Sequence, residues 1–428
     1  MNQRDYVELH CHSSFSLGDG ATTPEALAAR AAELGYTHLA LTDHDDLGGA
    51  VRFSRACAES GMSPLLGAEV TLADRSHLTL VVENLTGWRN LCGLLSQARM
   101  ESPRGEPGIA FDALAARAEG IVALSGCPNG RLARLLGQER HQAARAWAGR
   151  LRDVFGDRLY LELWDHRTHQ EASLCADLLD LAREMEVPWT VTHDVHYADA
   201  SGRAVHDLLT CIRRETTLQE AHRRGWLRPS AEWCLQPPAE MARRWRSAPE
   251  GIRRTREIAE RCGAFKLLEA PTVHPRFDLP AGWASADEML AHLARTGLRE
   301  RLPEATETHW TQLAHELAVI RQVGMADHFL IVWDICRFAR ENRILCQGRG
   351  SAANSLVCYA LRVTAVDPVA HDLLFERFLS VERPEPPDID IDFAALDDRE
   401  RVLQSVYQKY GRDHAAMVCT HVEYRGRS

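Results

Sequence analysis

Residues 5–46 read DYVELHCHSSFSLGDGATTPEALAARAAELGYTHLALTDHDD, and they contain one strand, one helix and a second strand. The apolar run DYVELH predicts the first strand, and HLALTD predicts the second. Between them, Thr22 and Thr23 can cap a helix, Pro24 suits its first turn, and ALAARAAEL continues with helical spacing. Similar alternation continues to about residue 200 and predicts an α/β fold, with β/α units around a parallel sheet or barrel.

The chain has 428 residues, of which 45% are hydrophobic and 26% charged, which is typical of a globular protein with two or three domains. Its net charge of -10 argues against unspecific binding of polyanions, although RRTR at 253–256 leaves room for local basic grooves. Twelve cysteines without a CxxC pair predict reduced thiols. With no signal peptide and no apolar run near the roughly 18 residues of a membrane span, we expect a cytoplasmic protein that binds no membrane.

Side chains of the types that can bind metals stand at the ends of the predicted strands. Because the carboxyl ends of parallel strands meet on one face, these side chains are expected to meet there. Together they could hold two or three zinc, manganese or iron ions. A single such histidine is more often a buried polar group, and Cys127 could be only a small apolar residue, but the repetition outweighs that interpretation. They are His10, His12, Asp43, His44, Glu69, Cys127, Asp194 and His196, with His77 at a strand start and Asp19 in a glycine turn.

The motifs ELHCHSSFSLGDG, ALTDHDDLGGAV, LSGCPNGRL and THDVHYAD resemble, in this order, those of a polymerase and histidinol phosphatase (PHP) domain. The resemblance implies a distorted β/α barrel whose trinuclear centre, with two or three zinc or manganese ions, hydrolyses phosphoesters. His193 stands where related motifs often have Asn. By resemblance the ligands are His10, His12, Asp19, His44, Glu69, His77, Cys127, Asp194 and His196.

The proline-rich segment EAPTVHPRFDLPAGW reads as a linker, and we expect one domain over residues 1–275 and another over 276–428. In the second domain, LAHELAVIRQVG and FLIVWDICRFAREN predict long amphipathic helices.

The segment ILCQGRGSAANSLVCYAL then predicts a short strand, a glycine turn and a helix beginning near Ala352. This arrangement would direct backbone N–H groups at an anion, with Arg349 and Ser351 beside it, so it predicts a phosphate site. GRGSAA also fits a dinucleotide fingerprint with Asp367 as its ribose acid, so a Rossmann fold stays an alternative.

Residues 386–393, PPDIDIDF, carry an acid at every second position. On an extended segment Asp388, Asp390 and Asp392 share one face, and the isoleucines between them face a core. Clustered carboxylates favour Mg²⁺, although a solvated acidic edge strand has the same pattern. The phosphate turn upstream favours two-metal phosphoryl transfer.

QGRGSAANSLVCYALRVTAVDP, LLFERFLSVERPEPPDIDIDF and YGRDHAAMVCTHVEYRGRS resemble the palm of the bacterial C-family DNA polymerase III alpha subunit, in its error-prone, ImuC-type branch. The resemblance implies nucleotidyl transfer with Mg²⁺, primer-template DNA and dNTPs, and partners such as a sliding clamp and mutagenesis-complex proteins. The alternatives are a stand-alone phosphoesterase or 3′ to 5′ exonuclease acting through the PHP site, and a metal-stabilised scaffold. By resemblance Asp388, Asp390 and Asp392 are catalytic, and Arg349, Gly350, Ser351, Arg377 and Arg383 bind the nucleotide.

Members of that family also carry a third catalytic aspartate, a thumb, fingers and a clamp-binding region further along the chain. We therefore expect a PHP domain and an incomplete, mixed α/β palm, which is either part of a longer protein or a truncated paralogue that does not extend primers alone.

Overall fold

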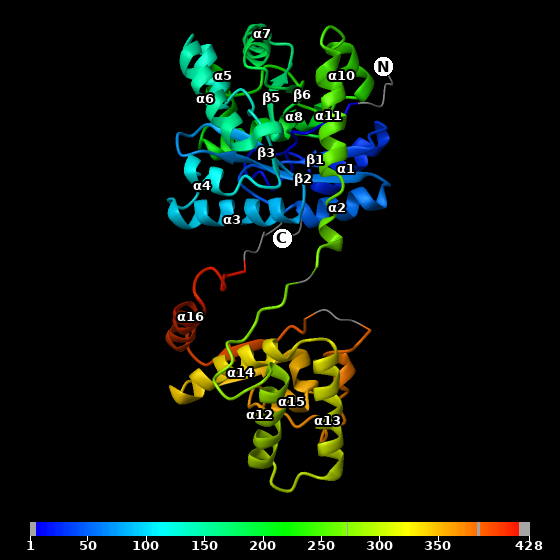
Figure 1. The fold of residues 1–428 in the computed structure, drawn as a ribbon, viewed down its shortest axis with the longest axis vertical. Helices are drawn as coiled ribbons and strands as arrows, with labels where there is room; N and C mark the ends of the chain where they lie inside the picture. The colour runs from blue at the N-terminus through cyan, green and yellow to red at the C-terminus, as the bar shows by residue number, and fades with distance from the viewer. Residues whose placement is uncertain (1–5, 272, 383–385, 419–428) are drawn as a thin grey trace. The chain divides into compact units, whose positions relative to one another are not determined.

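The computed structural model describes residues 6–271, 273–382 and 386–418 (Figure 1). The chain forms two compact units, Met1–Ala270 and Pro271–Ser428. The proline-rich segment predicted as a linker contains the change from one unit to the next, and its described residues from Ala270 to Ser285 form neither helix nor strand.

Unit 1 is built on a curled sheet with the strand order β1-β2-β3-β4-β5-β6, which confirms the predicted α/β class. The predicted parallel arrangement does not hold at β3, which is antiparallel to both neighbours. Only residues 72–76 separate β2 from β3, and a connection this short cannot make a parallel crossover. The strands are β1 His38–Leu41, β2 Ser63–Thr71, β3 His77–Val82, β4 Ile121–Leu124, β5 Leu159–Trp164 and β6 Trp189–Thr192.

The segment of residues 7–12 bonds to both edges of this sheet. Beside β1, the Ala40 amide donates to the Glu8 carbonyl at 2.9 Å. Just after β6, the Val195 amide donates to the His10 carbonyl, also at 2.9 Å. The bridges on both sides are parallel. Because the segment bonds to both edges of the sheet, it closes the sheet into the distorted barrel that the sequence predicts.

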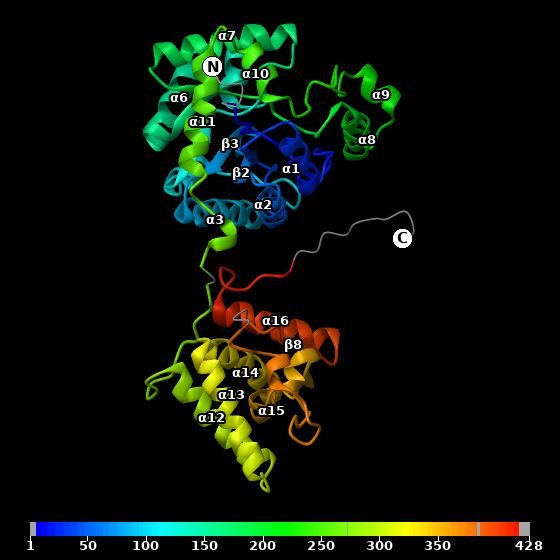
Figure 2. The same ribbon diagram turned by 90° about the vertical axis from the view of Figure 1, so that its right-hand side faces the viewer.

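Helices surround the barrel (Figures 1 and 2). The first begins as predicted, with the Thr23 hydroxyl accepting a hydrogen bond from the Ala26 amide at 3.3 Å. The helices are α1 Pro24–Glu33, α2 Ala50–Glu59, α3 Leu85–Glu101, α4 Phe111–Ala116, α5 Arg131–Gly137, α6 His141–Phe155, α7 His169–Glu184, α8 Arg203–Arg213, α9 Leu218–Arg223, α10 Pro238–Arg244 and α11 Pro249–Cys262, with short 3-10 turns η1 Gly156–Arg158, η2 Ala200–Gly202 and η3 Leu267–Glu269.

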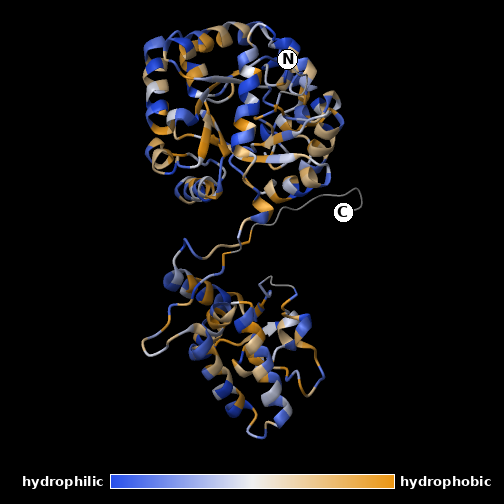
Figure 3. Cartoon of the chain, turned by 45° about the vertical axis from the view of Figure 1, so that its right-hand side comes forward, coloured by the Kyte–Doolittle hydropathy of each residue, from blue (hydrophilic) through white to orange (hydrophobic). Residues whose placement is uncertain are grey.

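Apolar side chains fill one end of the barrel, so the polar residues collect at the other. Val81 and Leu124 of the strands pack in one buried cluster with Ile258 of α11. This helix approaches β6 so closely that a Cβ on Gly251 would lie 2.3 Å from the Trp189 ring, so glycine is required there. Figure 3 shows the hydrophobic colour concentrated on the strands inside the surrounding helices.

Unit 2 is mixed α/β, as predicted, with helices packed around their own apolar core. Its two strands are antiparallel, so the described residues do not form the parallel βαβ unit of a Rossmann fold. No helix in the described parts of either unit has the length and apolar character needed to cross a membrane. The elements are α12 Ala286–Arg301, α13 Glu307–Gln322, α14 Ala326–Glu341, β7 Cys346–Arg349, η4 Gly350–Asn354, α15 Leu356–Ala360, η5 Phe375–Arg377, β8 Asp390–Phe393 and α16 Leu396–Tyr410.

The predicted start of a helix near Ala352 is wrong. The chain leaves β7 through Gly350, whose φ of 69° favours glycine, and forms the 3-10 turn η4. The α-helix α15 begins only at Leu356, after Ser355 has capped it by accepting from the Cys358 amide. The turn tightens the backbone before the helix can start, so the N–H groups of η4 and α15 do not form one continuous helix end.

Candidate functional site

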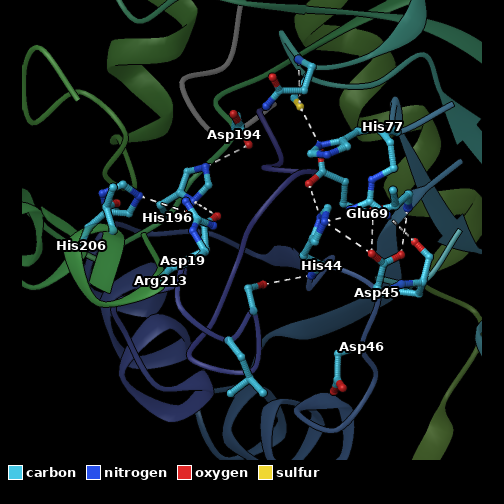
Figure 4. Close-up of a pocket in the computed structure, with 18 of the residues that line it drawn as sticks. Asp19, His44, Asp45, Asp46, Glu69, His77, Asp194, His196, His206 and Arg213 are labelled. Atoms are coloured by element: carbon cyan, nitrogen blue, oxygen red, sulfur yellow. Dashed lines mark hydrogen bonds and ion pairs between the residues drawn. The ribbon is translucent and has the colours of Figure 1, made fainter. Parts of the chain in front are cut away.

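A cavity of about 800 Å³ opens at the polar end of the barrel in unit 1 (Figure 4). The carboxyl ends of the parallel strands and the segments that follow them reach this end, as the sequence predicts. His77 begins its strand instead of ending it, but the reversed direction of β3 brings its first residue to the same place. Seven of the nine predicted ligands line the cavity, namely Asp19, His44, Glu69, His77, Cys127, Asp194 and His196.

Glu69 is the centre of one group of ligand atoms. Its Oε2 lies 2.8 Å from His44 Nδ1, and its Oε1 lies 3.1 Å from His77 Nδ1. His10, behind the cavity wall, places its Nε2 3.5 Å from Oε1 of the same carboxylate. One carboxylate with a histidine at each oxygen is suited to bridge two cations.

Asp194 is the centre of the second group. Its Oδ1 lies 3.5 Å from His12 Nε2 and 3.4 Å from His196 Nε2. His196 Nδ1 in turn lies 2.9 Å from Asp19 Oδ2, so Asp19 extends the group toward α8. Asp194 has a φ of 43°, in the left-handed region that few residues other than glycine adopt, and such backbone strain is frequent at functional sites.

The separations between these atoms fit ligands of shared ions. Two ligands about 2.0–2.1 Å from one zinc at tetrahedral angles lie roughly 3.4 Å apart. His10 Nε2 and His12 Nε2 are fully buried, lack a hydrogen-bond partner among the described residues, and face acidic oxygens at 3.5 Å. A buried polar atom without a partner is costly, and a cation would remove that cost. The residues present therefore fit a metal centre.

The electrostatics keep the carboxylates of the centre ionised. Burial would raise the pKa of Asp194, but His196 and His10 outweigh burial and hold that pKa well below its usual range. Burial likewise opposes ionisation of Glu69, and its histidine neighbours, His77 first, lower the pKa of Glu69 well below the ordinary value. An ionised carboxylate is the form that binds a cation, so the site is prepared for metal.

Cys127, the predicted thiolate ligand, lies beside the first group. Its Sγ is 3.5 Å from His77 Nδ1 and accepts from the Asn129 amide at 3.4 Å. Burial is the main cause that raises the pKa of this thiol, with Glu69 adding to the rise. Metal coordination would have to displace the thiol proton, as it does for any cysteine ligand.

Polar residues outside the cavity hold the ligands in place. His10 Nδ1 lies 2.7 Å from the buried Glu162, which fixes the orientation of the His10 ring. His12 Nδ1 lies 3.0 Å from the Ser16 hydroxyl, which donates to Asp43 at 2.7 Å. Asp43 thus helps to orient His12 through Ser16, although it stands at a strand end like the candidate ligands themselves.

His193, at the position where related motifs often have Asn, bonds away from the cavity. Its Nε2 donates to the Glu232 carbonyl at 2.6 Å, and its ring lies 4.8 Å from the His166 ring. Burial, together with His166, lowers the pKa of His193 well below its usual range, so the ring is neutral.

Three cavity residues from the helical region after residue 200 were missed in the sequence. His206 Nε2 lies 3.4 Å from Asp19 Oδ1, and Arg213 Nη1 lies 3.4 Å from the same oxygen. Arg228 Nη2 donates to His196 Nε2 at 2.8 Å. These side chains do not stand at strand ends, which is the position that pointed to the other residues. The sequence signal for them was only a histidine and arginines in an arginine-rich segment.

The candidate polymerase site in unit 2 lies on the β7-β8 pair. Burial alternates along β8 as predicted, with Asp390 and Asp392 exposed and Ile391 packed against the core. Arg349 of β7 lies opposite Asp390 and places its Nη2 3.5 Å from that carboxylate and its Nε 3.1 Å from Asp392. Asp388, just before β8, is exposed as well.

Asp390 and Asp392 belong to no group of three metal-competent side chains among the described residues. The groups of three metal-competent side chains found among the described residues all lie in unit 1. Arg349 stands between Asp390 and Asp392, where a cation would have to compete with its guanidinium.

The α15 N-terminus, which belongs to the predicted phosphate site, already holds an anion. The buried Glu316 of α13 accepts hydrogen bonds from the Leu356 amide at 2.9 Å and the Val357 amide at 3.0 Å, and from the Ser355 hydroxyl at 2.8 Å. A phosphate would therefore have to bind at η4 instead of at α15.

The remaining predicted nucleotide contacts are only partly described. Gly350 and Ser351 lie in η4 and are exposed. Arg377 is exposed in η5, which contacts η4. Arg383 lies outside the described residues.

Comparisons with known proteins find one family match in each unit. Residues 8–166 match the family model described as PHP domain, and residues 288–428 match the one described as Bacterial DNA polymerase III alpha NTPase domain. The chain thus matches a PHP domain and a DNA polymerase III alpha NTPase domain. The predicted resemblance to both is confirmed, and the barrel of unit 1 is the fold of its PHP domain.

Curated relatives match nearly the whole chain. An error-prone DNA polymerase of Symbiobacterium thermophilum is 42% identical over 99% of this chain and 40% of its own length. Its counterpart in Mycobacterium tuberculosis is 43% identical over 99% of this chain and 39% of its own. This PHP-containing chain thus spans about 40% of the length of these relatives. Among solved structures, an amidohydrolase from Chromobacterium violaceum is 19% identical over 45% of this chain and 87% of its own, with a TM-score of 0.32.

Proposed function

We propose that the PHP cavity holds two or three zinc or manganese ions and hydrolyses phosphoesters. The observation that supports this best is the pair of buried histidines, His10 and His12, whose Nε2 atoms lack hydrogen-bond partners among the described residues and face Glu69 and Asp194. When bound, such ions lower the pKa of a coordinated water and stabilise charge on phosphate oxygens. All nine predicted ligands would take part.

Arginines that line the cavity favour a negatively charged substrate. Phosphate oxygens accept bidentate hydrogen bonds from guanidinium groups, and several guanidinium groups surround the acidic and histidine floor. Arg228 donates to His196 Nε2 at 2.8 Å, which places its guanidinium group beside the proposed ligands. We propose the 3′ end of a DNA strand as the substrate. The arginines that line the cavity are Arg75, Arg99, Arg104, Arg213 and Arg228.

The test compares wild type with His12→Ala and, as a matched control, with His169→Ala on the exposed surface of α7. Each protein is stripped with a chelator and dialysed against zinc or manganese. We expect wild type and the control to retain two or three ions per chain and to release nucleotides from a 3′-labelled single strand. His12→Ala should lose at least one ion and most of the activity. Metal uptake without any hydrolysis would instead favour a metal-stabilised scaffold, and no uptake by wild type would refute the metal centre.

We also propose that the chain forms part of an error-prone DNA polymerase that acts in the cytoplasm. Two such polymerases are 42% and 43% identical to this chain over 99% of its length, and this supports the proposal. The acidic face of β8 supports it as well. In the whole polymerase Asp388 and Asp390 would bind Mg²⁺ with Asp392 in support. Arg349, Gly350, Ser351, Arg377 and Arg383 would bind the triphosphate, with primer-template DNA, a sliding clamp and mutagenesis-complex proteins as further partners.

Replacement of one acid in a polymerase that contains this chain tests that assignment. Asp390→Asn should reduce primer extension by at least about 10²-fold, because a metal ligand contributes several kcal/mol to the transition state. Glu400→Gln, an exposed residue of α16, is the control and should leave extension unchanged. Equal extension by both variants would remove Asp390 from the catalytic site.

A further inference from the structure

His206 of α8 is a buried histidine that the nine predicted ligands do not include. Its side chain is 3% exposed, yet neither ring nitrogen has a hydrogen-bond partner among the described residues. Its ring lies beside the His196 ring, with centroids 5.4 Å apart (Figure 4). An imidazole without partners in a buried position is destabilising, so the position requires an explanation.

The geometry around His206 is that of a ligand. Nε2 lies 3.4 Å from Asp19 Oδ1, while the other oxygen of Asp19 lies 2.9 Å from His196 Nδ1. One ligand atom from each of the three residues falls within 4.8 Å of the others. The separation of 3.4 Å is about the edge of a tetrahedron around one zinc. Nδ1 of His206 points elsewhere, 3.9 Å from Asp207, so Nε2 is the atom directed at the group.

We propose that His206 is a tenth protein ligand, which holds a divalent cation together with Asp19 and His196 at the α8 side of the PHP cavity. This inference rests on the proposed metal centre and adds to it a ligand from a helix outside the strand ends. Two neighbouring cationic groups do not exclude the ion. Arg213 is 46% exposed and can turn outward, and Arg228 bonds His196 through Nε2, whereas Nδ1 is the nitrogen that faces Asp19.

A purely orienting role is the competing explanation. In that case His206 would position Asp19 through a hydrogen bond, and its removal would alter catalysis without removing an ion. The number of bound ions and their affinity distinguish the two roles, because only a ligand contributes directly to both.

The experiment uses the full chain with zinc and, separately, manganese. Wild type, His206→Ala and His206→Gln are stripped and reloaded, and bound metal is measured by elemental analysis and by competition with a chelator. Far-UV circular dichroism and thermal melts check folding, and Gln, which keeps the volume, is used if Ala unfolds the protein. The matched control is His222→Ala, an exposed histidine of the neighbouring α9.

We expect both His206 variants to lose one ion per chain, or to bind that ion at least 10-fold more weakly, and the control to match wild type. With cobalt in place of zinc, the visible absorption of the variants should lose the contribution of one ion. Full occupancy and unchanged affinity in both variants would overturn the proposal and leave His206 an orienting residue. If wild type itself binds no metal, the proposed metal centre fails instead, and the two failures are therefore distinct.

Discussion

His10 shows how the ring of one proposed ligand is held in its orientation. Its Nδ1 faces Glu162, which also accepts from the Thr192 hydroxyl at 2.7 Å and the Gly126 amide at 3.1 Å. This buried network fixes the ring so that Nε2 points at Glu69. A carboxylate behind a histidine also makes the histidine a stronger electron donor to a metal.

Glu162→Gln should therefore weaken metal binding without removing a ligand. We expect the affinity for zinc to fall by about 10–100-fold, the usual effect of losing such a support. Chelator competition on the reloaded protein measures it, and Glu184→Gln, an exposed residue of α7, serves as the control. An affinity equal to that of wild type would show that the network only contributes to stability.

Single residues also show where sequence reasoning stops. The proximity of His10 and Asp194 could be predicted, because both stand where strands end. Glu162 lies in the middle of the apolar run LYLELW, and nothing in that pattern reveals that it faces a histidine 152 positions away. His206 lies on a helix, and its role depends on a tertiary contact with Asp19 that no local spacing encodes.

Helix α16 is attached to α14 through one carboxylate, that of Asp334. Asp334 lies 2.8 Å from Arg337 on its own helix, and it also pairs with Lys409 and Tyr410 of α16. Its side chain is only 6% exposed. Burial would raise the pKa of Asp334, but the bonds from Lys409 and the other donors outweigh burial and lower that pKa.

Acid should therefore weaken this attachment. Because the folded pKa lies below the unfolded value of about 3.9, the stability from Asp334 is fully present above roughly pH 4 and is lost as the pH falls through the lowered pKa. At pH 7 we expect Asp334→Asn to cost about 1–2 kcal/mol of the free energy of unfolding, and this deficit should shrink in acid. Urea melts of wild type, the variant and the exposed control Glu304→Gln across pH 3–7 measure the difference. A deficit that stays constant with pH would contradict this assignment.

Elements were predicted well where a local signal decides them. The Thr23 cap, the paired helices of unit 2 and the alternation along β8 follow from periodicity and capping. The direction of β3 was not predicted, because an apolar strand reads the same both ways; only the shortness of residues 72–76 indicates it. The start of α15 was misplaced because Glu316, far away in sequence, satisfies its first amides.

At the scale of the molecule, each unit has a separate apolar core. The residues of the barrel clusters all lie in unit 1, and those of the cluster that contains Phe329 and Leu356 all lie in unit 2. The proposed zinc or manganese ions would contact only the first unit. Thermal stability should therefore respond to metal in one part of the chain alone.

Calorimetry with and without a chelator tests this expectation. We expect two transitions, of which one falls by about 5–10 °C when the metal is removed, as loss of a ligand present at roughly 100 times its Kd implies. The other should not move. An isolated unit 2, residues 271–428, identifies its transition, provided that it folds. Equal shifts of both transitions would mean that the units unfold together.

The position of residues 7–12 sets the order in which the barrel can be completed. This segment leaves the ribosome before any strand, yet its second bonding edge, at Val195, is synthesised more than 180 residues later. Because His10 and His12 lie on this segment, the proposed ligand set is assembled only when this late, non-local pairing forms. During synthesis the two histidines therefore remain unpaired until the barrel closes. A metal ion bound by both histidines and Asp194 would stabilise the closed barrel.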